Sequence, residues 1–253
     1  KRQKNFSKAD DLIKVYGGKI FESYSDIVES EEIDAIYIPL PPALHYKWCV
    51  KALKKGKHVL VEKPATIDLG NTEKMINIAK KSNLAIHENY MFKFHKQIEG
   101  INNLILSGDI GEIRQFRIAF GFPKRKIGDF RYNYELGGGA IWDVGGYVLK
   151  YADYLLGGNV NIEAGQLNYS SEFNVDIFGS AFLTNDQGIT ALVSFGMDND
   201  YKCELEVWGS KGTLYTGRIL TAPEGYETFA IITKNGEKRI IKFGSDDTFY
   251  KSI

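Results

Sequence analysis

Apolar positions in the first third of the chain alternate between runs typical of buried strands and spacings typical of amphipathic helices. Short apolar runs predict strands at residues 35–38, 59–61 and 84–87. Helices are expected at residues 7–16 and 24–29, from 43 to about 55, and after 68. Strands that alternate with helices indicate parallel strands joined by right-handed crossovers, which is the doubly wound α/β arrangement.

Capping residues and apolar faces refine these helices. Ser7 and Asp68 have side chains that can cap the first and the last of them. The expected inward faces are Ala9, Leu12, Ile13 and Tyr16 in the first helix, Leu44, Trp48 and Ala52 in the third, and Met75, Ile76 and Ala79 in the fourth.

The pattern changes near residue 92. One more amphipathic helix is expected at 98–105, and it is followed by strand-like runs without long helices between most of them. Strict alternation of apolar and polar residues indicates a largely antiparallel sheet with one solvated face. We therefore expect two domains, 1–91 and 92–253, the second of class α+β. Its predicted strands are 113–120, 175–183, 189–195, 203–208 and 239–243.

Composition excludes several classes of partner. Lysine plus arginine and aspartate plus glutamate each total 32, so no net basic field exists to hold nucleic acid or an anionic membrane. No apolar run approaches the roughly 20 residues that span a bilayer, and a cytoplasmic location is expected. Cys49 and Cys203 have no C-x-x-C spacing, and the four histidines have no metal-motif spacing, so we expect no disulfide framework and no metal.

The strand at 59–61 ends by presenting a carboxylate and an amine. Glu62 and Lys63 follow it directly, and Pro64 stops the strand because it lacks a backbone N–H. Ligands of parallel sheets bind at the carboxyl ends of the strands, so chemistry is plausible at this position. The alternative is a solvated strand end with a structural ion pair.

A second candidate lies beyond three consecutive glycines at 137–139. If a helix opens there and continues through Leu156, Asp143 and Tyr147 stand one turn apart on a single face. A carboxylate and a phenol then point at one spot. The alternative is a packed aromatic helix in which Tyr147 only fills space.

These segments, with residues 33–41 and His45, resemble the oxidoreductase family named for glucose-fructose oxidoreductase, inositol 2-dehydrogenase and the rhizopine protein MocA. The resemblance implies a Rossmann-type domain that binds NAD or NADP. No G-x-G-x-x-G turn is present, so we expect the first strand, the phosphate loop and the second strand to be missing. The implied cofactor contacts are Leu40, Pro41, His45, Glu62, Lys63 and Asn89.

The resemblance also implies a reaction. Tyr147 stands where the inositol branch has histidine, and Lys150 replaces that branch's last carboxylate, which favours the sugar dehydrogenase and ketoreductase branches. Hydride transfer to or from a sugar, nucleotide sugar or similar polyol is expected. Tyr147 would exchange the proton, and Lys63 would favour its phenolate and bind the reacting hydroxyl or the cofactor ribose. Asp143 would orient a substrate hydroxyl or hold Lys63, and Lys93 and Arg131 are further substrate candidates.

The resemblance extends to assembly. The open sheet of this family commonly packs against that of another subunit, which implies a homodimer or homotetramer. Lys1 and Arg2 would fall near the adenosine ribose, where arginine can pair with a 2′-phosphate. The competing hypothesis is a non-catalytic regulatory or structural protein that binds a nucleotide on the same scaffold.

Overall fold

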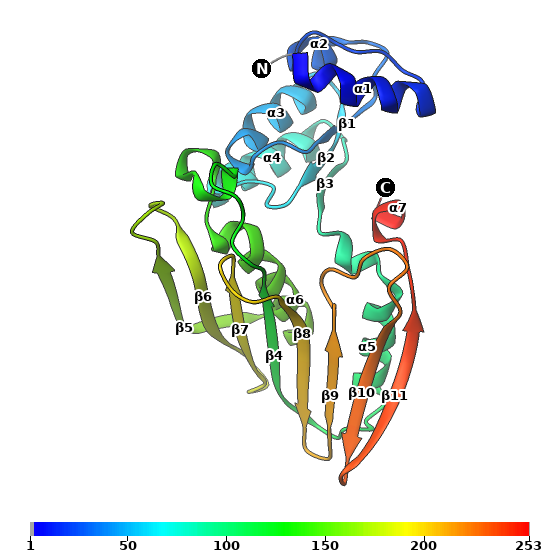
Figure 1. The fold of residues 1–253 in the computed structure, drawn as a ribbon, viewed down its shortest axis with the longest axis vertical. Coiled ribbons are helices and arrows are strands. Elements are labelled where there is room, and N and C mark those ends of the chain that lie inside the picture. Colours follow the sequence, from blue (N-terminus) through cyan, green and yellow to red (C-terminus); the bar gives the residue numbers. More distant parts are fainter. Residues whose placement is uncertain (1–2, 253) are drawn as a thin grey trace.

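A computed structural model describes residues 3–252, in two units stacked end to end (Figure 1). Lys1 and Arg2, with the expected 2′-phosphate contact, lie outside the described residues. The smaller unit contains a three-stranded parallel sheet with the order β1-β2-β3. Its elements are α1 (Gln3–Tyr16), α2 (Tyr24–Glu29), β1 (Ala35–Ile38), α3 (Pro42–Lys54), β2 (His58–Glu62), α4 (Leu69–Lys81) and β3 (Ile86–Asn89).

The predicted alternation of parallel strands and helices is confirmed. The register pairs Ile38 with Val61 and Glu62 with Asn89, so all three strands end at one edge of the sheet. Helices α3 and α4 pack against each other and bury Cys49, Leu53 and the strand residues Val59 and Val61. The carboxyl ends of the three strands therefore lie side by side at one well-packed edge of the sheet.

Several expected details of these helices are wrong. Helix α1 begins at Gln3, so Ser7 lies inside the helix and does not cap it, whereas Asp68 does cap α4 by accepting from the Asn71 N–H. Leu12 and Tyr16 are exposed.

The inward faces of α3 and α4 also differ from expectation. In α3, Ala52 is buried as predicted, whereas Leu44 and Trp48 are half-buried and the buried stripe contains His45 and Cys49 in their place. An apolar pattern could not locate this part of the stripe, because it includes a polar histidine. In α4, Ile76 is exposed, whereas Met75 and Ala79 are buried as predicted.

The larger unit is an eight-stranded sheet with the order β11-β10-β9-β8-β4-β7-β6-β5. Neighbouring strands are antiparallel except β4 and β7, which are parallel. The strands are β4 (Ile113–Gly121), β5 (Val160–Tyr169), β6 (Asp176–Asn185), β7 (Thr190–Gly196), β8 (Lys202–Gly209), β9 (Thr213–Gly217), β10 (Thr228–Lys234) and β11 (Glu237–Gly244). The other elements are η1 (Met91–Phe94), α5 (Lys96–Leu106), η2 (Phe130–Tyr132), η3 (Tyr134–Leu136), η4 (Ile141–Gly145), α6 (Gly146–Leu156) and α7 (Thr248–Ser252).

The pattern of apolar residues missed three strands of this sheet. Strand β5 is an edge strand whose residues are mostly exposed, and its alternation of apolar and polar residues at 160–164 breaks at Gly165. Strand β9 has only five residues. Strand β10 was also missed, although its inward residues Ala230 and Ile232 do alternate with half-buried ones.

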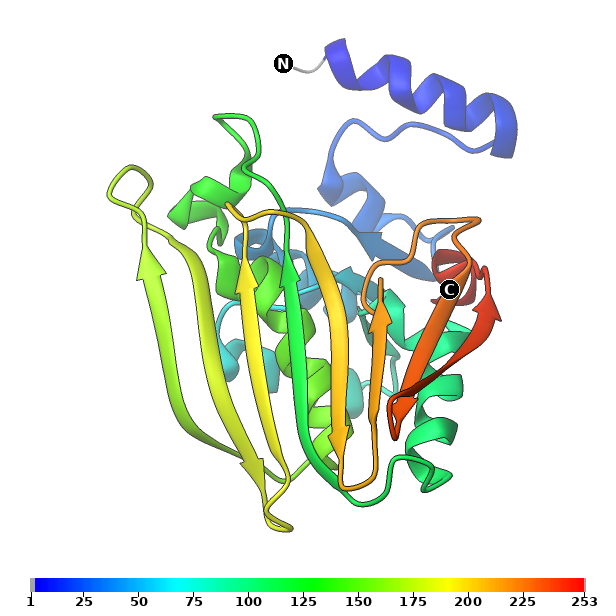
Figure 2. The ribbon, with the colours of Figure 1, turned by 60° about the horizontal axis from the view of Figure 1, so that its bottom comes forward.

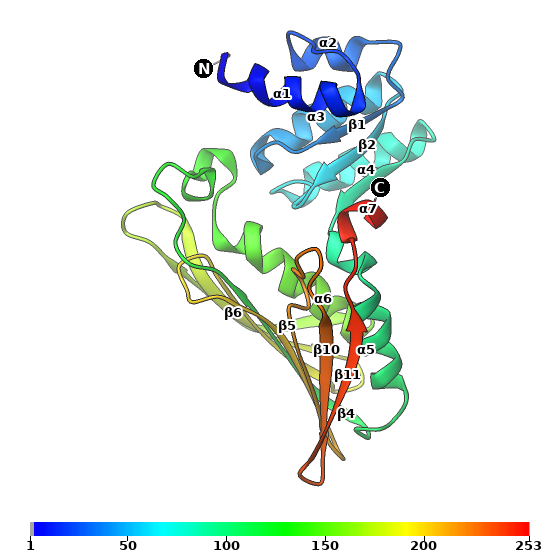
Figure 3. The same cartoon turned by 45° about the vertical axis from the view of Figure 1, so that its right-hand side comes forward.

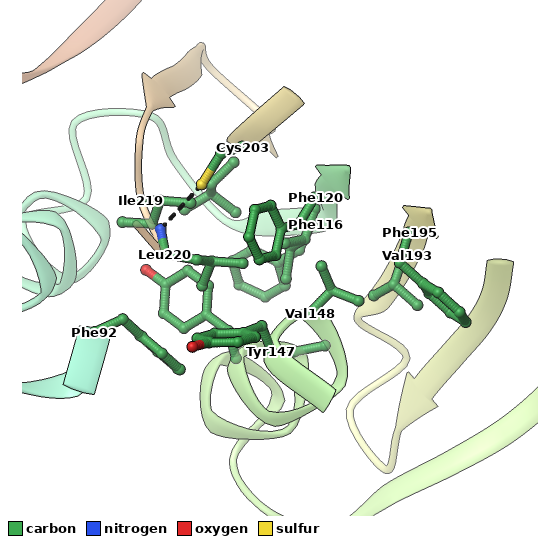
Figure 4. Close-up of a cluster of buried hydrophobic side chains, with 14 of the residues drawn as sticks. Phe92, Phe116, Phe120, Tyr147, Val148, Val193, Phe195, Cys203, Ile219 and Leu220 are labelled. Atoms are coloured by element: carbon green, nitrogen blue, oxygen red, sulfur yellow. Dashed lines mark hydrogen bonds between the residues drawn. The ribbon is translucent and has the colours of Figure 1, made fainter. Parts of the chain in front are cut away.

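Helices α5 and α6 cover one face of the eight-stranded sheet, and the opposite face is bare (Figures 2 and 3). The covered face forms the main core, where Phe116, Phe120 and Val193 of the sheet meet Tyr147 and Val148 of α6 (Figure 4). Helix α6 also faces the smaller unit, so its first turns lie where the two units meet (Figure 3).

Candidate active site

A cavity of about 290 Å³ lies between the two units, at the edge where β1 and β2 end. Carboxyl ends of parallel strands form one wall, as expected for a ligand site in an open α/β sheet. The loops before α6 form the other. The lining residues are Pro39, Leu40, Pro41, Pro42, Glu62, Lys63, Phe130, Arg131, Gly137, Gly138, Gly139 and Asp143.

Lys63 and Asp143 join the two walls directly. The Lys63 Nζ lies 2.7 Å from the Asp143 Oδ1 and 2.7 Å from the Asp143 backbone oxygen. The other carboxylate oxygen, Oδ2, accepts from the Arg131 Nε at 2.6 Å, and the Arg131 Nη1 in turn donates to Asp129 at 3.1 Å. Both oxygens of Asp143 are thus occupied by cations, which favours holding Lys63 over binding a substrate hydroxyl.

The electrostatics of Asp143 follow from these partners. Burial by itself would raise the pKa of the Asp143 carboxyl, but the charges of Lys63 and Arg131 and their hydrogen bonds outweigh burial and hold this pKa below its ordinary value. Burial lowers the pKa of the Arg131 guanidinium, and the carboxylates of Asp143 and Asp129 more than restore it. Asp143 and Arg131 are therefore both charged at neutral pH.

A π-helical turn shapes this wall of the cavity. Asp176 anchors its start, because the Asp176 Oδ2 accepts from the Ile141 N–H at 2.7 Å. Residues Ile141–Gly145 then form a π-helix that continues into α6, a local irregularity that is frequent at functional sites. Asp143 and Tyr147 both contact Lys63 from this segment, Asp143 through its carboxylate and Tyr147 through its ring.

Tyr147 meets Lys63 through its ring and not through its hydroxyl. The Lys63 Nζ lies 4.8 Å from the ring centroid, while the Tyr147 hydroxyl points to the Met91 Sδ at 3.6 Å. Burial raises the pKa of the Tyr147 phenol, and the carboxylates of Asp143 and Glu62 raise it further. The expectation that Lys63 would favour the phenolate is wrong for this structure, because burial and two carboxylates dominate.

Glu62 lines the cavity and is held by its neighbours on β1 and β3. Its Oε1 accepts from the Tyr37 hydroxyl at 2.7 Å and from the Asn89 amide nitrogen at 2.9 Å. The Asn89 Oδ1 is buried without a hydrogen-bond partner among the described residues. Asn89 does not line the cavity, so its observed contact with the site is the one through Glu62.

His45 supports the cavity from outside. It is fully buried in α3, and its two ring nitrogens lie 2.8 Å from the Pro64 backbone oxygen and 2.6 Å from the Leu40 backbone oxygen. Leu40 and Pro41 line the cavity, as the expected cofactor contacts require. His45 itself does not line it, so its place is consistent with holding the loops and not with touching a cofactor.

Lys93 is the expected site residue that lies elsewhere. It is exposed on η1, and its ammonium group lies 6.0 Å from the ring centroid of Tyr154, near the far end of α6. Sequence reasoning also overlooked Asp129, which holds the lining residue Arg131, and Glu88, which bonds to Ala65 and Lys150 outside the lining. The signal for Glu88 was its position at the end of β3, the strand next to β2.

Other site classes find no support in the described part of the chain. No cluster of three or more His, Cys, Asp or Glu side chains there has a geometry that holds a metal ion. Among residues 3–252, no helix is long and apolar enough to cross a membrane.

Two family models match this chain. Residues 3–90 match the oxidoreductase family with an NAD-binding Rossmann fold, and residues 98–215 match the GFO/IDH/MocA C-terminal domain. Among curated relatives, the dTDP-3,4-didehydro-2,6-dideoxy-alpha-D-glucose 3-reductase of Actinomadura kijaniata is 35% identical over 99% of this chain and 75% of its own length. The enzyme of the same name from Saccharopolyspora spinosa is 35% identical over 91% of this chain and 69% of its own.

Solved structures of related proteins are similar to this chain as well. A 3-ketoreductase from Actinomadura kijaniata, in complex with NADP and TDP-benzene, superposes with a TM-score of 0.94 at 35% identity, covering 97% of this chain and 76% of that one. Its open conformation superposes with a TM-score of 0.90 at 34% identity, with 97% and 75% covered. This chain spans about three quarters of the length of these relatives.

Proposed function

This chain belongs to the GFO/IDH/MocA family of NAD(P)-dependent oxidoreductases that act on sugars, and we propose that it reduces a keto group on a nucleoside-diphosphate sugar with NADPH. Membership of the family establishes the type of reaction, which is NAD(P)-dependent oxidation or reduction of a sugar. What we propose in addition is the keto group on the substrate, the attached nucleotide, and NADPH as the cofactor.

The observation that carries it is the contact of Lys63 with both Asp143 and the Tyr147 ring where the two units meet. Lys63 and Asp143 line the cavity, and Tyr147 contacts Lys63 from outside that lining. An ammonium group and a phenol beside a ligand cavity can bind and protonate the oxygen of a carbonyl group. Asp143 has both oxygens occupied, so it fixes the ammonium group in place.

The named relatives support the substrate class. Two curated relatives are reductases of a dTDP-linked sugar, and the solved 3-ketoreductase holds NADP and TDP-benzene. That ketoreductase was also solved with a tyrosine replaced by phenylalanine and with a lysine replaced by alanine. The two substituted positions are separated by the same number of residues as Lys63 and Tyr147 here.

The protonation state of the phenol suits the proposed reduction. Burial and the neighbouring carboxylates raise the pKa of Tyr147, which keeps its proton in place at neutral pH. A protonated phenol can donate to the oxygen of a carbonyl group as that group is reduced. The Tyr147 hydroxyl has to leave the Met91 Sδ to reach the cavity, and a thioether is a weak acceptor that gives little resistance.

The cofactor end of the cavity is proposed to lie against β1 and β2. Leu40 and Pro41 would pack against the nicotinamide, and Glu62, held by Asn89, would face the cofactor from the end of β2. When bound, the nicotinamide supplies the hydride. Lys63 would bind the substrate oxygen, and Arg131, on the opposite wall, would anchor a neighbouring hydroxyl or phosphate oxygen.

The test is NADPH consumption by the purified protein with a dTDP-linked 3-keto sugar, the same sugar without the nucleotide, and NADH as the alternative cofactor. We expect turnover with the nucleotide-linked sugar and at least a ten-fold lower kcat/KM without the nucleotide. Turnover of free sugars alone would show that the substrate class is wrong. NADPH binding without turnover of any sugar would favour a non-catalytic nucleotide-binding protein.

We also propose that the bare face of the eight-stranded sheet pairs with a second copy of the chain. Large apolar side chains alternate with buried ones along its strands and therefore point outward together. The exposed members are Phe178, Leu192, Trp208, Tyr215 and Ile240. These side chains share the face with exposed charged residues such as Arg117 and Glu206. Exposed large apolar side chains gathered on one sheet face are typical of an interaction surface.

A further inference from the structure

One carboxylate outside the cavity connects both walls of the site. Glu88 lies on β3, and its Oε1 accepts from the Ala65 N–H at 2.8 Å. Ala65 is two residues after Lys63, so this bond fixes the turn that presents the ammonium group. A charged acceptor on a backbone N–H forms one of the stronger kinds of hydrogen bond.

The second oxygen of the same carboxylate reaches the other unit. The Glu88 Oε2 lies 3.2 Å from the Nζ of Lys150, which is three residues after Tyr147 on α6. Residues three apart in a helix lie on the same face. Glu88 therefore connects the turn of Lys63 to the helical face that carries Tyr147.

An aromatic contact continues this connection toward the phenol. The Lys150 ammonium lies 4.8 Å from the centroid of the Tyr90 ring, and the Tyr90 ring meets the Tyr147 ring edge to face at 5.2 Å. Tyr90 fits against α6 closely, because a Cβ at Gly146 would lie 2.4 Å from the Tyr90 hydroxyl. Movement of Lys150 would therefore disturb Tyr90 and, through it, Tyr147.

We propose that Glu88 and Lys150 are positioning residues that hold Lys63 and Tyr147 at the separation that the reaction needs. The proposal rests on the proposed function for its catalytic consequence. Neither residue lines the cavity, so the pair acts through the Ala65 turn and α6. The Glu88 and Lys150 ion pair adds to the hydrogen bond between Lys63 and Asp143. Because this ion pair does not use the Lys63 ammonium, a substrate that competes for that ammonium leaves the pair intact.

Because the Glu88 and Lys150 pair is partly exposed, a role in positioning catalytic groups can be distinguished from a role in stabilising the fold. The Lys150 and Glu88 side chains are 38% and 28% exposed, so their ion pair contributes little to the free energy of unfolding. A small misplacement of catalytic groups can nevertheless reduce turnover strongly. A loss of activity without a matching loss of stability is the signature to look for.

The experiment compares Lys150→Met, Lys150→Arg and Glu88→Gln with a control, Lys55→Met. Lys55 forms an exposed ion pair with Glu29, far from the cavity lining. Lys150→Met keeps the apolar stem and removes the charge, and Lys150→Arg keeps the charge. Three quantities are measured: kcat and KM for NADPH and sugar, the thermal midpoint, and hydrogen exchange of the Ala65 amide without substrate.

Lys150→Met is expected to lower kcat roughly ten-fold, to leave KM for NADPH within about two-fold and to speed exchange at Ala65. Lys150→Arg should recover most of the kcat, and the double variant with Glu88→Gln should lose no more than the stronger single variant, because the pair acts as a unit. The thermal midpoint should change no more than in Lys55→Met.

Unchanged Ala65 exchange in Lys150→Met overturns the proposal, and so does unchanged kcat in an active wild-type background. A kcat loss that arginine does not recover also overturns it. If the wild-type protein turns over no sugar, the proposed function fails, and Ala65 exchange alone decides whether Lys150 holds the turn.

Discussion

The ammonium group of Lys63 donates two hydrogen bonds to one residue, Asp143, which belongs to the other unit of the fold. Both side chains are nearly buried, at 13% and 11% exposure. An ammonium group has three donors, so one donor remains for a substrate oxygen. The bond thus aims Lys63 and ties the two walls of the cavity together.

Replacing Lys63 by methionine removes this ammonium group while keeping most of the stem. We expect kcat to fall about a hundred-fold or more, because Arg131, the other cation that lines the cavity, is held by Asp143 and Asp129, while NADPH binding changes only a few-fold. Steady-state kinetics and nicotinamide fluorescence measure the two effects. Lys80→Met, on the exposed face of α4, is the control and should leave both unchanged.

Tyr147→Phe tests the proton donor. The ring contacts with Phe92 and Phe120 remain, and the lost hydroxyl contacts only the Met91 Sδ, so the free energy of unfolding should change by less than about 1 kcal/mol. Turnover should fall about a hundred-fold or more. Tyr151→Phe removes a buried hydroxyl that has no hydrogen-bond partner among the residues that the structure describes, and it should keep full activity. Equal activity of the two variants would contradict the role of Tyr147.

The Asp143 carboxylate makes stability depend on pH in acid. Its pKa is lower in the folded than in the unfolded protein, so the stabilisation is fully present above an ordinary carboxyl pKa of 3.8 and is lost as pH falls through the folded-state pKa. Urea unfolding of the wild type between about pH 6 and pH 3 should show this loss.

Asp143→Asn is the matched comparison for this pH dependence. It should be less stable at neutral pH by about 3–5 kcal/mol, because Lys63 and Arg131 lose their charged partner. It should also show a smaller decline in acid. An equal acid-dependent decline in both proteins would show that other carboxylates dominate.

Gly138 is expected to tolerate no side chain. A Cβ there would lie 2.4 Å from the Arg131 backbone oxygen and 2.8 Å from the Asn133 backbone oxygen, so the loop that carries Arg131 would have to move. Gly138→Ala should lower kcat/KM for the sugar more than ten-fold with a smaller effect on NADPH binding. Gly70→Ala, in the first turn of α4, meets only the Asp68 carboxylate at 3.5 Å and is the control.

The bare sheet face makes a prediction about assembly. Leu192→Glu combined with Trp208→Glu places two charges on this face, and analytical ultracentrifugation should then report monomers where the wild type forms oligomers. Leu106→Glu changes an equally apolar, 83% exposed residue on α5 and should leave the assembly intact. A monomeric wild-type protein would refute the proposed contact.

Local pattern and chemistry determined much of this protein. The runs at 35–38 and 59–61 became β1 and β2 because β-branched and apolar residues suit a sheet covered by helices. The position of Glu62 and Lys63 at a strand end, and the one-turn spacing of Asp143 and Tyr147, predicted a site that the structure brings together. These features depend on periodicity within a few residues, which a sequence displays directly.

Only the tertiary structure decided the rest. In the folded protein Lys93 lies outside the site and the Tyr147 hydroxyl points toward Met91. The pKa of the Tyr147 phenol is raised, where the sequence had led us to expect it to be lowered. The tertiary structure also joined Glu88 to both Ala65 and Lys150. The physical reason is that burial and charge at a point are set by residues far apart in the chain, and their separation in space exists only once the two units have packed together.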